Sequence, residues 1–222
     1  MKYIKLFENF EDYDPYELMM ITPQKKAQMI IDELRSGNTN KSLIETLITM
    51  GADNNWQDED GWTALNYAIS FNKEDICKML IDAGTDPNIR DIDNKTPVHY
   101  AAKAWKPNNK ILLLLLDAGG EVNVRDKDWG WTPLMYALHA NNISIFELLL
   151  KAGADPNIQS NNGNTSLHWA ILFNYKSPEI IKELLDAGAD PMIKNEDGIT
   201  SLELAKDHKF IELINLFDNY KS

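Results

Sequence analysis

The chain has 222 residues, of which 44% are hydrophobic, and it carries a formal net charge of −12. The excess of acids argues against binding to nucleic-acid phosphates, because that attraction depends on lysine and arginine. A single cysteine, Cys77, excludes an intramolecular disulfide and a zinc site built on several cysteines. The longest apolar run, residues 111–116, is too short to cross a bilayer.

Residues 1–21 form a leader in which aromatic side chains alternate with acids. Pro15 is expected to interrupt any helix there. We expect the aromatic residues to pack on the first helical unit, and the alternative is a short interaction or targeting peptide. The first ten residues faintly resemble the leaders of tailed-phage proteins.

Residues 22–57 predict a pair of helices that caps one end of a longer structure. Thr22 and Pro23 suit the N-cap and the first helical position, and apolar residues at helical spacing follow over 24–34. Gly37 ends that helix, and residues 42–50 predict the second one.

A glycine-centred block then recurs along the chain, at Gly51, Gly84, Gly119, Gly153 and Gly188, in steps of 33, 35, 34 and 35 residues. A threonine that opens a short helical pattern follows each block, at Thr63, Thr96, Thr132, Thr165 and Thr200. Self-similarity at this period indicates stacked repeats rather than a globular domain.

These two motifs resemble the ankyrin repeat, whose signature is T-P-L-H-x-A followed by a second helix and G-A-D-x-N. The resemblance implies an all-α repeat solenoid of helix-turn-helix pairs linked by β-hairpin-like turns. It divides 58–194 into four repeats, at 58–90, 91–125, 126–159 and 160–194, and makes 195–222 a C-terminal capping repeat. It also implies a non-enzymatic protein–protein interaction module.

Several positions have expected structural roles. Asn72 is expected to cap the helix at 73–83, and Asn94 replaces a turn glycine because asparagine tolerates left-handed geometry. His99 and His168 occupy the motif's histidine position, where the resemblance implies hydrogen bonds that steady neighbouring hairpins. We expect a half-buried ladder from Tyr67, Tyr100, Tyr136 and Trp169, and solvated hairpin acids in the pairs Asp58/Asp60 and Asp91/Asp93.

No catalytic, cofactor or metal residues are expected, because the sequence has no glycine-rich phosphate loop, H-E-x-x-H or G-x-S-x-G motif. The candidate partner-binding residues are those that the repeat does not require. They sit before each threonine, at the ends of the first helices or at hairpin tips. They are Trp62, Phe71, Lys95, Trp105, Trp129, Trp131, His139, Asn164 and Phe173, with the acids Asp60, Asp93 and Asp128.

Large aromatic side chains with no folding role are typical binding anchors, and acids around them favour a partner with basic and apolar features. We therefore expect a cytoplasmic, monomeric protein-binding module with no membrane or nucleic-acid partner. A phage- or pathogen-encoded effector or anti-defence adaptor, acting in the host cytoplasm, is a narrower hypothesis. The alternatives are an acidic decoy that mimics nucleic acid and inhibits a DNA-binding protein, and a small-molecule or nucleotide-binding protein.

Overall fold

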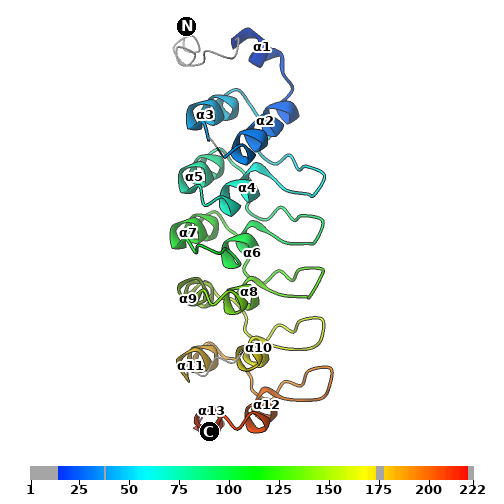
Figure 1. Ribbon diagram of the computed structural model, residues 1–222, viewed down its shortest axis with the longest axis vertical. Helices are drawn as coiled ribbons and strands as arrows, with labels where there is room; N and C mark the ends of the chain where they lie inside the picture. The colour runs from blue at the N-terminus through cyan, green and yellow to red at the C-terminus, as the bar shows by residue number, and fades with distance from the viewer. Residues whose placement is uncertain (1–14, 38, 174–177, 220–222) are drawn as a thin grey trace.

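The computed structural model describes residues 15–37, 39–173 and 178–219, which form one elongated stack of helix pairs (Figure 1). An N-terminal helix α1 (Pro15–Met20) precedes the pair α2 (Pro23–Arg35) and α3 (Lys41–Thr49). The next pairs are α4 (Ala64–Ser70) with α5 (Glu74–Asp82), α6 (Pro97–Ala102) with α7 (Asn109–Asp117), and α8 (Pro133–His139) with α9 (Ile143–Lys151). The last pairs are α10 (Ser166–Leu172) with α11 (Pro178–Asp186), and α12 (Ser201–Asp207) with α13 (Ile211–Asn219).

The first helices of the pairs form one column and the second helices form another, with the hairpin loops beyond the first column (Figure 1). Each first helix packs against its own second helix and against the first helices on either side. Leu65, Leu134 and Leu167, which share one position in the repeat, are fully buried in this way. The core is therefore continuous along the stack, as expected of a repeat solenoid.

The recurring threonines begin the first helices. The hydroxyl oxygens of Thr63, Thr132 and Thr200 accept hydrogen bonds from the backbone N–H three residues later. This satisfies one of the N–H groups that the first turn leaves unpaired. The expected local role of these threonines is confirmed.

Consecutive hairpins are bonded to one another at their tips. The backbone N–H of Lys127 donates to the carbonyl of Asp93 at 2.8 Å, and that of Asn161 donates to the carbonyl of Trp129 at the same distance. The hairpin at 126–132 is one residue longer than the one at 91–96, yet it keeps a bond to each neighbouring hairpin, so the longer loop does not break the series of tip contacts. Among the described residues the hairpins contain one isolated β-bridge, Lys194 with Thr200, and no strand.

Two local expectations were wrong. Pro15 begins α1 instead of interrupting a helix, because proline is favourable in the first turn. Asn72 does not cap α5: the N-cap is Lys73, and Asn72 instead takes a left-handed φ of 55°. Asn94 does take the predicted left-handed geometry, with φ 63°.

The leader is described only in part, since residues 1–14 lie outside the described residues. Leu18 of α1 is 1% exposed and belongs to the core, whereas Tyr16 is 76% exposed. The described part of the leader therefore contacts the stack through an aliphatic side chain, and for Tyr16 the expected burial of an aromatic residue was wrong. The sequence Ser177-Pro178 also predicts an N-cap at Ser177 for the helix that starts at Pro178, and Ser177 lies outside the described residues.

Candidate functional site

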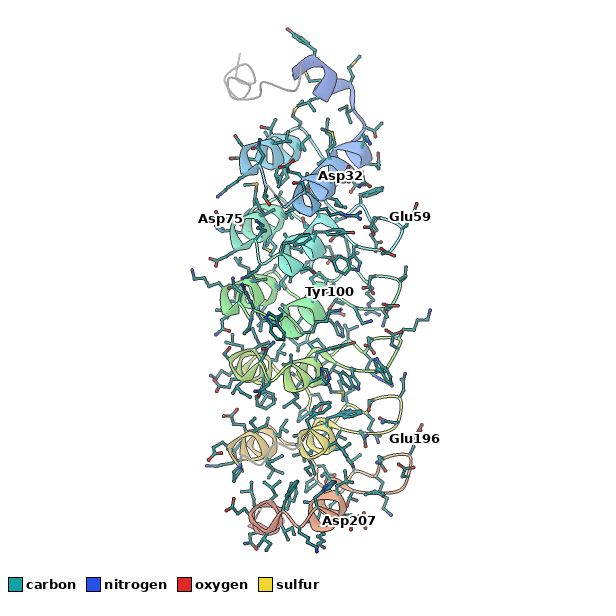
Figure 2. The ribbon with its side chains drawn as sticks, viewed as in Figure 1. Asp32, Glu59, Asp75, Tyr100, Glu196 and Asp207 are labelled. Carbon is teal, nitrogen blue, oxygen red and sulfur yellow. The ribbon has the colours of Figure 1, made fainter. Side chains whose placement is uncertain are left out.

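One long face of the molecule is formed by the hairpin tips and the solvent-facing side of the first helices, and we call it the hairpin face. Glu59 and Glu196 lie at hairpin tips near its two ends, and Tyr100 lies on a first helix between them (Figure 2). Asp75 lies on the second-helix side, away from this face. Nearly all the predicted partner-binding residues come from the elements that build the hairpin face.

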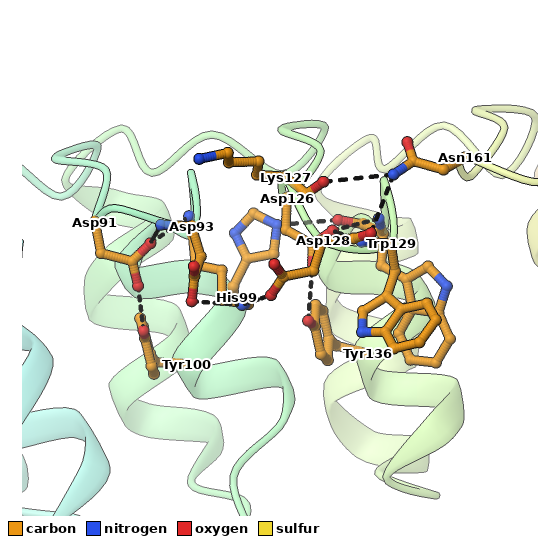
Figure 3. Close-up of polar contacts among 12 residues, drawn as sticks. Asp91, Asp93, His99, Tyr100, Asp126, Lys127, Asp128, Trp129, Tyr136 and Asn161 are labelled. Atoms are coloured by element: carbon orange, nitrogen blue, oxygen red, sulfur yellow. Dashed lines mark hydrogen bonds and ion pairs between the residues drawn. The ribbon is translucent and has the colours of Figure 1, made fainter. Parts of the chain in front are cut away.

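An acid–tyrosine pair joins each of three hairpins to its first helix. One oxygen of Asp58 accepts the backbone N–H of Trp62 at 2.9 Å, and the other accepts the hydroxyl of Tyr67 at 2.7 Å. The same pairing recurs in the next two repeats, Asp91 with Tyr100 and Asp126 with Tyr136 (Figure 3). Burial and the neighbouring carboxylate raise the pKa of Tyr67 to about 12.

These bonds decide two sequence predictions. The half-buried ladder is confirmed for Tyr67, Tyr136 and Trp169, whereas Tyr100 is buried, with 5% exposed. All four side chains are held by specific hydrogen bonds. The prediction that Asp91 is a solvated acid was wrong, because the residue is 7% exposed and its carboxylate bonds the backbone N–H groups of Asp93 and Lys95 and the hydroxyl of Tyr100.

A first aromatic cluster surrounds Trp62. Its ring centroid lies 4.5 Å from that of Tyr100 and 5.0 Å from that of Tyr67, and Tyr67 stacks on Phe71 at 6.4 Å. Trp62 is half-buried and Phe71 is 46% exposed. This cluster thus keeps aromatic surface open to solvent.

A second cluster surrounds Trp131, and here the expectation of an outward anchor was wrong. The Trp131 side chain is 8% exposed, because Tyr136 of its own repeat and Trp169 and Phe173 of the next repeat enclose it, with centroids 5.0 to 5.9 Å away. Its indole nitrogen has no hydrogen-bond partner among the described residues. Trp131 therefore supports the face from beneath rather than projecting from it.

The rim of this second cluster is accessible. His139 is exposed and lies 5.2 Å from Trp131 and from Phe173, which is itself half-buried. Trp129 is 63% exposed at the hairpin tip, with its centroid 6.4 Å from that of Trp131. The exposed Trp129 thus lies beside the cluster of aromatic side chains around the buried Trp131.

Two further candidates are structural. Lys95 is 6% exposed, and its ammonium lies 3.1 Å from Asp93 and 2.7 Å from Asp128 of the next hairpin. Burial alone would lower the pKa of Lys95, but the bonds to Asp128 and Asp93 raise it. Asn164 is 4% exposed and accepts a hydrogen bond from Asn195. Lys95 and Asn164 therefore connect repeats, and the expectation that they project outward was wrong.

The acids Asp60, Asp93 and Asp128 lie at the hairpin tips as expected, but a lysine partly neutralises two of them. Asp60 is exposed, and no ion pair joins it to another described residue. Asp93 and Asp128 are partly open, with side chains 43% and 46% exposed, but they share the Lys95 ammonium. The middle of the acidic rim is therefore partly neutralised.

Lys103 is a functional candidate that the site prediction did not include. Its ammonium lies 4.2 Å from the ring centroid of Tyr100 and 6.0 Å from that of Tyr136, so it bridges the two aromatic clusters. Such cation–π contacts hold a charge over a ring. Although Lys103 is exposed as a whole, partial desolvation of its ammonium, followed by repulsion from Lys95, lowers the pKa of Lys103. The available signal in the sequence was its place at the end of a first helix, beside Trp105.

The two histidines of the repeat motif are occupied in structural bonds. His99 lies 3.0 Å from the backbone nitrogen of Thr96 and 3.3 Å from the carbonyl oxygen of Trp131, and His168 makes the equivalent contacts with Thr165 and Ile199. Their predicted role is confirmed. Within 15–37, 39–173 and 178–219, no cluster of three or more histidine, cysteine or acidic residues is arranged to hold a metal ion. Burial raises the pKa of Cys77 to about 12, so its thiol stays protonated.

Fold and face together define a class: a solenoid protein of stacked helix pairs with projecting hairpins. A family model described as ankyrin repeats (3 copies) matches the chain over two overlapping ranges, residues 34–126 and 104–195. The chain belongs to the ankyrin repeat family. No helix in the described part of the chain has the length and apolar character needed to span a membrane.

Curated relatives come from several kinds of organism. A putative ankyrin repeat protein of Acanthamoeba polyphaga mimivirus is 28% identical over 136 residues, which cover 61% of this chain and 18% of the relative. One of Rickettsia bellii is 34% identical over 151 residues, 66% of this chain and 42% of that protein. The 2-5A-dependent ribonuclease of Mus musculus is 43% identical over 51 residues, 23% of this chain and 7% of the ribonuclease. The chain thus spans less than half the length of each of these relatives.

Proposed function

We propose that this chain binds a partner protein through the hairpin face, without catalysing a reaction. Ankyrin repeats are general protein–protein interaction modules, and the chain carries the family's repeats over most of its length. The observation that carries the proposal is Trp129, which is 63% exposed at a hairpin tip although its backbone is bonded to the next hairpin. A large aromatic side chain on a fixed backbone loses little conformational entropy when a partner binds, which makes it a favourable binding anchor.

The partner's chemistry follows from what surrounds that ring. His139 and Phe173 extend the accessible aromatic surface, and Asp128, which Lys95 partly neutralises, precedes Trp129 in the same hairpin. Asp60 adds an exposed carboxylate at a hairpin tip two repeats away. A partner with a basic rim and an apolar centre complements this surface, and the acids would speed association more than they tighten the complex. We further propose that the chain is monomeric in isolation and acts in the cytoplasm, in the host cytoplasm if it is viral.

A narrower proposal is that the chain is a phage- or pathogen-encoded effector or anti-defence adaptor. This proposal is supported by the similarity of the chain to ankyrin repeat proteins of an amoebal virus and of Rickettsia bellii. Blocking, recruiting and sequestering a host protein would each follow from occupancy of the same face.

The test is affinity purification from the native host, with quantitative mass spectrometry, using three forms of the full chain. We expect Trp129→Ala to deplete the specific partner at least about tenfold relative to the unmodified chain. Leu113→Ala, which removes a 42% exposed side chain on α7 at a distance from the hairpins, is the control and should retain it. Equal capture by all three forms would contradict the proposal.

An acidic nucleic-acid decoy is the weaker alternative. It requires a strip of negative charges spaced like phosphates, and Lys95 neutralises part of that strip at Asp93 and Asp128. A nucleotide-binding role has one observation in its favour, the Lys103 ammonium held over Tyr100 among aromatic rings. Titration of the chain with ATP, followed by thermal denaturation, tests the nucleotide alternative, since a bound ligand raises Tm with its concentration.

A further inference from the structure

A hollow of about 310 Å³ lies between the C-terminal ends of α4 and α6, and we call it the helix-end hollow. Its walls include Ile69, Phe71, Tyr100, Lys103, Trp105 and Lys106. The Trp105 side chain is 94% exposed and that of Phe71 is 46% exposed. Two large rings therefore border an open, mainly apolar depression with nothing in the described chain to cover them.

The loop that carries Trp105 is fixed on both sides. The side-chain amide of Asn142, from the next repeat, donates to the carbonyls of Ala102 at 2.9 Å and Ala104 at 3.0 Å. The amide of Asn108 donates to Asn72 of the preceding repeat at 2.9 Å. Because the backbone is tied to both neighbouring repeats, the exposed ring is presented on a prepared surface, which reduces the entropy lost on binding.

The charge of the hollow is opposite to that of the rest of the molecule. The chain carries a net charge of −12, yet the charged side chains of the lining are Lys103 and Lys106, with no carboxylate among them. Neither lysine forms an ion pair within the described ranges. The nearby acids Asp91 and Asp93 are already bonded to Tyr100 and Lys95.

The size of the hollow limits what it holds. Pockets for whole small molecules span about 300–1,000 Å³ and enclose most of the ligand. A depression of about 310 Å³ is at the lower end of that range and lies open to solvent. It suits one large side chain whose own backbone remains outside, which favours a polypeptide.

We propose that the helix-end hollow binds an acidic segment of a partner protein. One large apolar side chain of that segment is seated between Phe71 and Trp105, and a neighbouring carboxylate lies on Lys103 or Lys106. Charge complementarity selects the acidic segment, and the paired rings select the apolar residue. This surface differs in charge from the acidic hairpin tips, so it is a second contact of opposite chemistry, beyond the proposed function.

The test is selection of phage-displayed random peptides on the purified full chain, with counter-selection on the folded Trp105→Ala variant. We expect the surviving peptides to contain a large apolar residue flanked by aspartate or glutamate. Enrichment of basic peptides, or no peptide that discriminates against Trp105→Ala, would overturn the proposal.

Fluorescence anisotropy with the best selected peptide gives the quantitative result. Trp105→Ala and Lys103→Gln should each weaken binding about tenfold or more, and Lys103→Gln should also reduce its dependence on salt. Matched controls at the hairpin tips are Ile92→Ala, which removes a 60% exposed side chain, and Lys127→Gln, which removes an exposed charge. Neither control should change the affinity, and an equal loss in the controls would refute the assignment.

Three further binding measurements distinguish a different binding surface or a different occupant of the hollow. For peptides selected without the counter-selection, loss of binding in Trp129→Ala but not in Trp105→Ala would place the peptide on the hairpin face, supporting the proposed function while refuting the hollow. Binding of a labelled oligothymidine that depends on Trp105 would replace the polypeptide with nucleic acid. Tighter binding of a synthetic peptide copying residues 1–14 would assign the hollow to the chain's own N-terminal segment and overturn the partner assignment.

Discussion

The Nε2 nitrogen of His99 lies 3.3 Å from the carbonyl oxygen of Trp131, so the first helix of one repeat is bonded to the hairpin of the next. The Nδ1 nitrogen of the same ring accepts the backbone N–H of Thr96 at 3.0 Å. A neutral imidazole with its proton on Nε2 satisfies both bonds, whereas a protonated ring loses the acceptor at Nδ1. The link between these two repeats therefore depends on the charge state of one buried histidine.

Because of this link, we expect the free energy of unfolding to depend on pH. Burial, the largest cause, lowers the pKa of His99 from 6.5 to about 4. Between these two pKa values the unfolded chain binds a proton that the folded chain does not, so the free energy of unfolding falls as pH drops from about 6.5 to about 4. Above that window the stabilising contribution of the neutral His99 is fully present. The shift corresponds to a loss of about 3 kcal/mol across the window. The pKa of His168 is lowered in the same direction, again mainly by burial.

Urea unfolding at about pH 7.5 and about pH 4.5 measures this effect. We expect His99→Gln to show a smaller difference in unfolding free energy between the two pH values than the unmodified chain. His139→Gln, at an exposed histidine, is the control and should keep the full difference. An unchanged pH dependence in His99→Gln would show that other groups are responsible.

The two tryptophans of the third hairpin should respond differently to truncation. Trp131→Ala removes a buried ring and should reduce the unfolding free energy by about 3–5 kcal/mol. Trp129→Ala removes an exposed ring and should change it by less than about 0.5 kcal/mol. Urea denaturation of both variants is the measurement. A small loss in Trp131→Ala would mean that this ring serves binding rather than folding.

Two turn glycines with similar backbone angles should also differ. Gly61 and Gly84 have φ of +76° and +86°, so alanine is strained at either position. A Cβ at Gly84 meets nothing within 4 Å, and Gly84→Ala should cost about 1–2 kcal/mol from the backbone angle alone. A Cβ at Gly61 lies 2.8 Å from the Asp91 Cα, so Gly61→Ala must also displace the next hairpin.

The additional cost at Gly61 is about 1–3 kcal/mol, the usual range for overpacking. Calorimetric unfolding of the two variants side by side gives the comparison, with Gly84→Ala as the matched control for backbone strain. Equal losses would mean that the hairpins move apart easily, and that tip-to-tip contact is not part of the rigid stack.

Prediction from sequence succeeded where a residue's role is local or repeated. Thr63 caps a helix, Asn94 takes a left-handed turn and His99 bonds a neighbouring hairpin, as expected. It failed at two helix starts. Pro15 is the first residue of α1 rather than a residue that interrupts a helix, and the N-cap of α5 is Lys73, one residue after Asn72. Helix ends are decided by small free energies, so patterns of residue types place them poorly.

The sequence by itself determined the repeat, the stacked helix pairs and the acidic surface, because those follow from a period, a set of turn residues and a count of charges. Only the tertiary structure decided which unshared side chains are exposed. Trp62 and Trp131 occupy the same position before a threonine, yet Trp131 is enclosed by Trp169 and Phe173 of the next repeat. Lys95 is likewise drawn inward by Asp128 of the following hairpin. The burial of such a residue is set by side chains about one repeat away, whose contact with it is fixed only when the repeats stack.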